Sequence, residues 1–514
     1  MFEPHPIEFR RMARFFCKVS RFSRTIKAIS LSLWNCNSHH AIIVPLMQSI
    51  EMINLSVTPH SNLSNREFKD WEFRIAKRLL GSTTRIRGVS LDVCDSRCLR
   101  MITRYPHLRS ANLKGSFSKI LEDQNLIDRL VQKKEKQTKF DLRLTLAVTE
   151  EYISSDMKQS TKNKIRRLRI FNESQVSHFP IILDSPYQLT NFENFSYCDK
   201  TNTDIISINS LKNVGKLNVL KHFSLEIRSE TDLQKIFENL TLPPSLEHFV
   251  LHLLLNSDDS LDCQQENYVF VKSLKTLQRL KSFGLKLSAT FFQENPTFCF
   301  QGLMFIKECL MHVTDNIEAL KLYIANNFEG NELLKCPELL ARMLSFKNLR
   351  CFAVDIPFLS DESIEDYLLP KIRPKVVYYS SPRLTNIFDH ISIQDLETLR
   401  CFICKNMPFD MTKKLLSALA KAKSLRSVNL IVSTEKELDG AIEIIGECVH
   451  KILKNLTRLQ TFFLTIEINS MYLNDDQLNR LKDFLPWNPS LVNFKINFCG
   501  RIIMMKPNHV YDTW

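Results

Sequence analysis

The chain has 514 residues, of which 44% are hydrophobic, and a formal net charge of +13. This hydrophobic fraction is enough for a large buried core and excludes a wholly disordered chain. Glycine is scarce, with 10 residues, which argues against a nucleotide-dependent enzyme, because loops that cradle phosphate need glycine to bring the backbone close.

The first third of the sequence is strongly basic. Residues 1–169 carry 32 Lys and Arg against 16 Asp and Glu, a net charge of +16, whereas the remaining residues have a net charge of −3. Such asymmetry points to an anionic partner, such as nucleic acid, for the basic third. Residues 1–25 are basic and amphipathic, which predicts a helix that caps the first of the repeated strands described below. A mitochondrial transit peptide is the alternative.

The sequence also predicts where the protein is found. No stretch approaches the ~18 to 20 uncharged apolar residues of a membrane span, and the N-terminus does not resemble a secretory signal. We therefore expect an intracellular protein, cytoplasmic or nuclear, with a mitochondrial location as the alternative. The 14 cysteines are then expected to be reduced thiols in apolar surroundings.

A short run near residue 165 concentrates positive charge, with five basic residues in eight. Lysine and arginine gain affinity for phosphate through counterion release, so this run is a candidate anion-binding or nuclear-import site. The alternative is a solvated strand, because Ile165, Leu168 and Ile170 continue an apolar alternation. The candidate anion-binding residues are Lys162, Lys164, Arg166, Arg167 and Arg169.

One phrase recurs along the chain, most clearly from about residue 217 onward. "LKHFSLEI" at Leu220 and "LQTFFLTI" at Leu459 share the form apolar-x-x-Phe-x-Leu-x-Ile. Successive clear copies are 26 to 37 residues apart, except for one step of 50 that a weaker copy, "VVYYS" at Val376, divides. The clear copies begin at Leu220, Leu246, Leu280, Ile317, Leu349, Leu399, Leu425, Leu459 and Leu491, and fainter ones at Ile26, Ile86, Leu108, Ile165 and Phe192.

Each copy of the phrase predicts one β-strand. Alternation with a period of two sends Phe223, Leu225 and Ile227 to one side of the strand, and Ser224 and Glu226 to the other. A single strand of this kind cannot bury its apolar side alone. Stacked parallel copies form a continuous core in which phenylalanine packs on phenylalanine, and the 35 Phe of the chain suit that use.

The segments between the copies predict helices. Apolar residues at spacings of three and four mark residues 231–240 and 412–422. Thr434 and Glu437 have the spacing of a capping box and predict a helix start, and Asn474 is a candidate cap for a later helix. A strand followed by a helix fits the length of the repeat.

The phrase and its spacing resemble the leucine-rich repeat family, whose pattern is L-x-x-L-x-L, and in particular its ribonuclease-inhibitor-like type. The resemblance implies an α/β solenoid with parallel strands on the concave face and helices on the convex face, in irregular repeats of about 23–37 residues. The family usually places Asn or Cys three residues after the last Leu, where this chain has Arg228, Leu254 and Glu467. We therefore expect a divergent solenoid, with degenerate, basic repeats over 26–216 and better-formed repeats with a C-terminal cap over 217–514.

No catalytic motif stands out in the sequence, and we expect a protein that is not an enzyme and that needs no metal or cofactor. Cys401 and Cys404 form a lone C-x-x-C inside a strand phrase. A structural zinc site needs four ligands, so we expect core thiols there. Cys94 and Cys98 would likewise supply only part of a ligand set.

The resemblance also implies a binding surface, because leucine-rich repeats commonly bind partners along the strand face. Tyrosine and phenylalanine at outward strand positions suit protein recognition; the alternative is that other segments of the chain cover them. The candidate partner-binding residues are Val250, His252, Lys286, Lys321, Tyr323, Ile431, Phe463, Thr465 and Lys495. We expect a non-enzymatic scaffold for a protein partner, with a substrate receptor of a ubiquitin ligase or a nucleic-acid-associated structural subunit as alternatives.

Overall fold

In the computed structural model, the chain forms two compact units, residues 1–231 and 232–514. The residues that the structure describes are 28–34, 51–58, 73, 77, 85–92, 96–116, 122–135, 140–148, 165–172, 191–199, 208–228, 233–255, 269–289, 296–325, 334–356, 359–360, 371–381, 387–407, 409–434, 438–468, 473–486, 488–506 and 509–513. The expected capping helix at 1–25 lies outside them. The predicted boundary at residue 216 separates degenerate repeats from better-formed ones. This boundary stays a prediction.

The first unit contains a parallel sheet whose strands follow one another in chain order. Each strand pairs in parallel with the next, from β1–β2 to β7–β8. The strands are β1 (Ala28–Trp34), β2 (Met52–Thr58), β3 (Gly88–Asp92), β4 (Ser110–Ser116), β5 (Asp141–Val148), β6 (Arg167–Asn172), β7 (Asn194–Asp199) and β8 (His222–Arg228). Helices α3 (Ser96–Ile102), α5 (Gln124–Glu135) and α8 (Ile208–Val214) connect some of these strands, and α3 packs against α5.

The second unit repeats the same arrangement with more helices. Its parallel strands, paired in this order, are β9 (His248–Leu255), β10 (Ser282–Ala289), β11 (Ala319–Ala325), β13 (Cys351–Asp355), β15 (Val376–Ser381), β16 (Thr398–Met407), β17 (Ser427–Thr434), β18 (Thr461–Ile468) and β19 (Asn493–Phe498). The weak copy at Val376 is therefore confirmed as a strand. The shorter elements are the pair β12 (Leu334–Lys335) and β14 (Leu359–Ser360) and the 3-10 helices η5 (Ile387–His390) and η6 (Ile393–Asp395).

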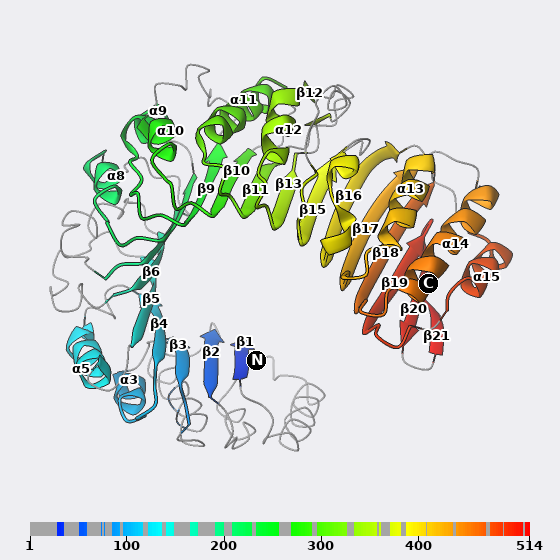
Figure 1. Ribbon diagram of the computed structural model, residues 1–514. Helices are drawn as coiled ribbons and strands as arrows, with labels where there is room; N and C mark the ends of the chain where they lie inside the picture. Colours follow the sequence, from blue (N-terminus) through cyan, green and yellow to red (C-terminus); the bar gives the residue numbers. More distant parts are fainter. Residues whose placement is uncertain are drawn as a thin grey trace, which may run out of the picture. The chain divides into compact units, whose positions relative to one another are not determined.

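Helices cover one face of this second sheet (Figure 1). They are α9 (Leu233–Asn239), α10 (Val269–Leu274), α11 (Pro296–His312), α12 (Pro337–Leu344), α13 (Phe409–Leu419), α14 (Leu438–Asn455) and α15 (Asp475–Asp483). Neighbouring helices pack on one another, α11 on α12 and α14 on both α13 and α15. The helices expected at 231–240 and 412–422 are α9 and α13. The strand–helix alternation confirms an α/β fold of the solenoid kind.

Antiparallel strands end the second unit. β20 (Arg501–Lys506) pairs with β19, and β21 (His509–Thr513) pairs with β20. The turn between β19 and β20 has positive φ angles at Cys499 (48°) and Gly500 (82°), the backbone conformation that a two-residue hairpin turn requires. The parallel order of the sheet thus stops at β19.

The predicted alternation of side chains is confirmed. Phe223, Leu225 and Ile227 are at most 2% exposed, whereas Ser224 and Glu226 between them are half-buried. The same alternation recurs in β18 and β19. Core and outward residues therefore occupy opposite sides of every such strand, as a period of two demands.

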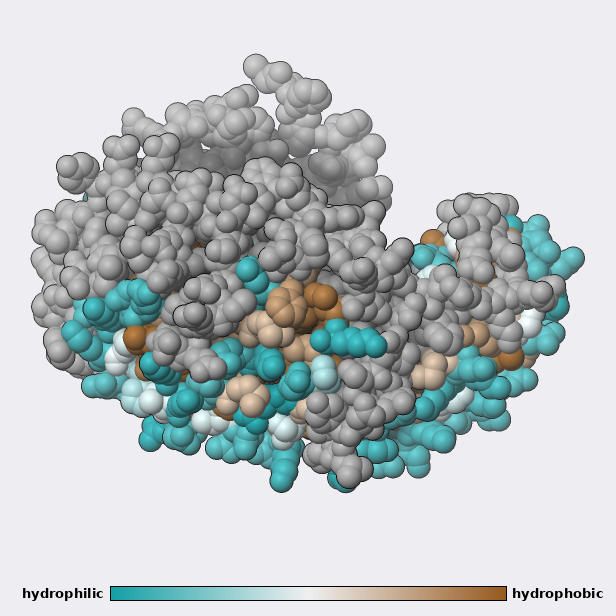
Figure 2. Space-filling view, turned by 90° about the horizontal axis from the view of Figure 1, so that it is seen from above, coloured by the Kyte–Doolittle hydropathy of each residue, from teal (hydrophilic) through white to brown (hydrophobic). Residues whose placement is uncertain are grey.

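Phenylalanines stack along the core from strand to strand. The ring centroids of Phe195 and Phe223 lie 5.7 Å apart, and those of Phe462 and Phe494 lie 5.8 Å apart, with both pairs stacked. Offset stacking of this kind adds about 0.5–1.5 kcal/mol to the burial of the rings. On the described surface seen in Figure 2, hydrophobic residues form small areas among hydrophilic ones.

Two expected helix starts had different outcomes. Asn474 caps α15, since its side chain accepts a hydrogen bond from the backbone N–H of Gln477 (2.8 Å) and the Gln477 side chain accepts one from the N–H of Asn474 (3.0 Å). The start at Thr434 stays a prediction: Thr434 is the last residue of β17, level with Ile468, and the described part of α14 begins at Leu438. Glu437, the other residue of that predicted capping box, lies outside the described residues.

Candidate functional site

The register of the second unit arranges its outward side chains in rows that cross the strands. The first row is Val250, Gly284, Lys321, Ala353, Tyr378 and Arg400. The second row, two residues further along each strand, is His252, Lys286, Tyr323, Asp355 and Ser380. Because residues i and i+2 of a strand share a face, both rows lie on the side away from the core. We call this side the outer face.

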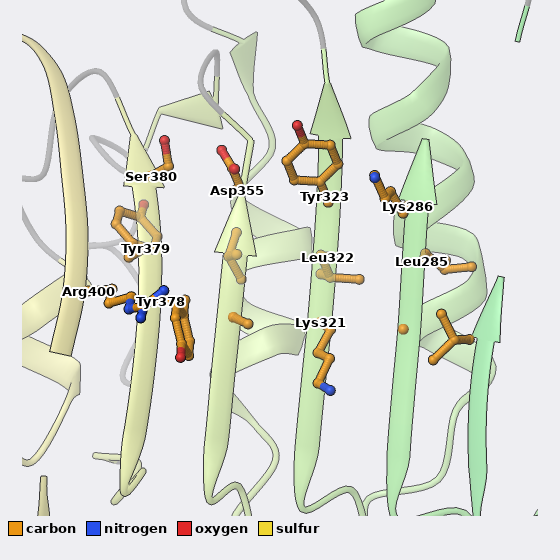
Figure 3. A pocket seen from close by; sticks show the side chains of 14 residues that line it. Leu285, Lys286, Lys321, Leu322, Tyr323, Asp355, Tyr378, Tyr379, Ser380 and Arg400 are labelled. Atoms are coloured by element: carbon orange, nitrogen blue, oxygen red, sulfur yellow. The ribbon is translucent and has the colours of Figure 1, made fainter. Parts of the chain in front are cut away.

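A hollow of about 540 Å³ opens on the outer face between β9 and β16 (Figure 3). Its depth comes from the two smallest side chains of the first row, Gly284 and Ala353, which flank Lys321. A Cβ atom on Gly284 would lie 3.2 Å from Cγ2 of Val250, so a larger residue there would crowd its neighbours. Because every lining residue lies on a strand, the hollow is preformed.

Two tyrosines in the hollow each lie under a cation. Nζ of Lys286 is 5.0 Å from the ring centroid of Tyr323, and Cζ of Arg400 is 5.4 Å from that of Tyr378. Such contacts contribute about 0.5–1 kcal/mol at exposed sites and keep ring and charge together. Tyr378 is 37% exposed, so part of its ring remains accessible to a ligand.

One lining residue of the hollow, Asp355, is a carboxylate. Burial raises the pKa of Asp355, and a hydrogen bond from Ser380 offsets part of that rise. Burial also raises the pKa of Tyr323, to which the charge of Asp355 adds. The cations that line the same hollow are Lys286, Lys321 and Arg400. The hollow therefore carries a net positive charge even when Asp355 is ionised.

Part of the predicted partner-binding set lines the hollow. The residues that do so are Val250, Lys286, Lys321 and Tyr323. His252 lies beside Lys286 in the second row but does not line the hollow, and its Nε2 is 3.3 Å from Oγ of Ser288. The hollow thus gathers side chains from β9, β10 and β11 that the sequence had placed on one face.

The other predicted residues form a separate group on β17, β18 and β19. Phe463 lies level with Lys495, and Ile431 lies level with Thr465. All four are half-buried and continue the two rows of the outer face, but they do not line the hollow. Their role in partner binding stays a prediction.

Sequence reasoning missed several residues that shape the hollow. Tyr378 and Arg400 lie in copies of the strand phrase that had been recognised, "VVYYS" and "LRCFICKN", at outward positions. Extending the alternation to these two copies would have found both side chains. Gly284, a lone glycine inside a strand phrase, is itself a sign of close packing or of a missing side chain.

The basic run in the first unit is partly neutralised. Arg166 Nη1 lies 3.8 Å from a carboxylate oxygen of Glu193, and Arg167 Nε lies 3.5 Å from one of Asp141. Arg169 is exposed. Outside the described residues lie Lys162 and Lys164. Ion pairs of this kind reduce the charge that the run offers to an anion, so its use as an anion-binding site stays a prediction.

Neither a metal-binding cluster nor a membrane-spanning helix is found among the described residues. Within the described ranges, no three His, Cys, Asp or Glu side chains could together hold a metal ion. Cys401 is buried in β16 as a free thiol; the side chains of Cys94, Cys98 and Cys404 lie outside the described residues. Among the helices described, none is both long and apolar enough to span a bilayer.

Comparisons with known proteins leave the architecture as the main guide. The chain matches no protein-family model, and no curated protein sequence is significantly similar to it. The solenoid architecture is observed directly in the parallel strands of the two units, whereas the resemblance to the leucine-rich repeat family rests on the repeated phrase and stays a prediction. Function must therefore be argued from the site itself.

Proposed function

We propose that this chain is a non-enzymatic scaffold that binds a protein partner on the outer face of its second unit. The observation that carries the proposal is the preformed hollow in which Tyr323 and Tyr378 lie beside cations. Tyrosine and arginine dominate the binding energy of protein interfaces. Because rigid strands hold these side chains in place, less conformational entropy is lost when a partner binds.

The repeat supports an assignment to the leucine-rich repeat family, as a divergent member of the ribonuclease-inhibitor-like type. In the second unit, buried apolar or aromatic side chains recur on each parallel strand at the places that the phrase predicts. The helices between strands pack beside one another, as in a strand–helix solenoid. A binding role on the strand face is the use that this resemblance implies.

The proposal is tested by comparing the partners of the native chain with those of a double variant. Full-length chain carrying Tyr323→Ala and Tyr378→Ala should lose most of a captured protein, because two aromatic anchors are removed from the hollow. The matched control is Phe300→Ala, which removes an exposed aromatic side chain from α11, on the other face of the sheet. Capture is measured by quantitative mass spectrometry at moderate salt after nuclease treatment.

Two results would count against the proposal. Equal capture by the native chain and the double variant would place the interaction elsewhere. Nucleic acid as the retained material, lost at higher salt, would instead favour a nucleic-acid-associated role for the basic first third.

A further inference from the structure

The charges that line the hollow indicate the kind of partner segment it accepts. Three cations, Lys286, Lys321 and Arg400, face one carboxylate, Asp355, among the lining residues. A basic segment would meet mostly like charges, whereas an acidic segment would meet mostly opposite ones. Electrostatic complementarity of this kind selects partners and speeds their association.

The spacing of two cations matches the geometry of an extended chain. Lys321 and Arg400 stand in the same row on β11 and β16, which are three strand spacings apart. With about 4.8 Å between strands, their Cα atoms lie roughly 14 Å apart. In an extended segment, residues i and i+4 are about 13 Å apart and point the same way, as does i+2 between them.

We propose that the hollow binds an extended acidic segment of a partner protein, with Asp or Glu at positions i and i+4 and an apolar or aromatic residue at i+2. The two carboxylates pair with Lys321 and Arg400, and the central side chain packs over Ala353 and against Tyr378. This inference rests on the proposed function and specifies the chemistry of the partner at the same site. Asp355 opposes this occupant, because it adds a like charge inside the hollow.

Single-stranded nucleic acid is the competing occupant, because it also needs cations and aromatic rings. The floor of the hollow favours the peptide, since Val250, Gly284 and Ala353 offer an apolar surface and no charge. A nucleic acid strand is bound along a charged groove that follows its backbone, whereas here two cations of one row stand about 14 Å apart with an apolar surface between them.

The inference is tested with the full chain and two labelled peptides by fluorescence anisotropy. One peptide carries the core Glu-Ala-Phe-Ala-Glu and the other the core Lys-Ala-Phe-Ala-Lys, with the same flanking Gly and Ser residues. The Glu peptide should bind at least about tenfold more tightly than the Lys peptide, and more weakly as salt is raised. Lys321→Glu and Arg400→Glu should each weaken it about tenfold or more, while Asp355→Asn should strengthen it.

The matched control is Arg373→Glu, which reverses an exposed arginine outside the lining of the hollow and should leave the affinity unchanged. The inference is overturned by equal binding of the two peptides, by no saturable binding of the Glu peptide up to about 1 mM, or by weaker binding to Asp355→Asn. Tighter binding of a single-stranded oligothymidine that Arg400→Glu abolishes would assign the hollow to nucleic acid. If the peptides fail while a captured partner still requires Tyr323 and Tyr378, the proposed function stands and only the acidic segment is wrong.

Discussion

The outer face of the second unit and the outward side of the strands in the first unit share a strand geometry but differ in chemistry. In the first unit, polar side chains bond to one another across strands: Asn112 Nδ2 donates to Ser90 Oγ (3.1 Å), and Thr145 Oγ1 donates to Asn112 Oδ1 (3.2 Å). In the second unit, the outer face holds tyrosines and cations around a hollow, including Tyr378 and Arg400. These three polar side chains of the first unit are thus bonded to one another, whereas the second unit has a hollow lined by rings and cations.

This difference shows that the core and the outer face of such a strand can change independently. Phe223 in the first unit and Phe283 in the second are both buried, at 2% and 0% exposed. Because side chains alternate between two sides, replacing outward residues leaves the stacked core unchanged. The same buried core can thus be combined with outward side chains of different chemistry.

The largest expected effect tests whether the two cores are equivalent. Phe223→Ala and Phe283→Ala should each lower the free energy of local unfolding by about 3–5 kcal/mol, because each leaves a cavity in a packed core. Native-state hydrogen exchange of the amides in β8 and β10 measures this. The control is Ser224→Ala, on the outward side of β8, which should lower the free energy of local unfolding by less than about 0.5 kcal/mol. If the two variants lost clearly different amounts of unfolding free energy, the cores of the two units would not be equivalent.

The next effect tests whether the two faces differ in function. Arg169 and Arg400 form a matched pair, since each is exposed and lies over a ring, at 4.5 Å from the centroid of Phe171 and 5.4 Å from that of Tyr378. Arg400→Glu should reduce capture of a protein partner about tenfold, or ~1.4 kcal/mol. Arg169→Glu should leave it unchanged. Equal losses in quantitative capture would show that both faces bind.

A smaller effect tests how the first unit keeps its arginines neutralised. Asp141 lies 2.8 Å from Nη2 of Arg143 and 3.5 Å from Nε of Arg167. Asp141→Ala should cost less than about 1 kcal/mol of stability, because the pairs are partly exposed. It should also raise the affinity for a single-stranded oligonucleotide at low salt, measured by anisotropy. Asp476→Ala removes the same charge at an exposed position of α15 and is the control. An unchanged affinity would contradict the proposed neutralisation.

The smallest effect concerns Asp355, the half-buried carboxylate in the hollow. Burial raises the pKa of Asp355 above its unfolded value near 3.8, so the folded chain holds that proton more tightly. Stability contributed by the protonated form is therefore lost as the pH rises from below 3.8 through the raised pKa. Asp355→Asn should be more stable than the native chain at pH 7, by less than about 1 kcal/mol, and equal to it below pH 3.8. Urea unfolding across this pH range measures the difference. If the hydrogen bond from Ser380 outweighs burial, Asp355→Asn would instead be less stable than the native chain at pH 7.

Much of the fold was predictable because its signals are local. Alternation within eight residues identified the strand at Phe223 and even the weak copy at Val376. The cap at Asn474 was also recognisable, since it needs only residues within one helical turn.

Other features depend on neighbours far away in the chain. Lys134 belongs to the basic first third, yet it is fully buried and donates a hydrogen bond to the backbone carbonyl of Tyr105. Asn488 is 3% exposed, and its Nδ2 donates to the carbonyl of Leu453 (2.7 Å) at the end of α14 and to that of Leu456 (3.0 Å) just beyond it. None of these three carbonyl partners could be chosen from the residues beside Lys134 or Asn488 in the sequence.

The sequence by itself determined the repeated strand, its buried and outward sides, and the helices between the copies, because these follow from spacing within one repeat. Only the tertiary structure decided which outward side chains meet in the hollow. That choice depends on register across six strands, from Val250 on β9 to Arg400 on β16. A shift of one residue in any strand would turn its outward side chain into the core, so the site exists only when all the strands are in place.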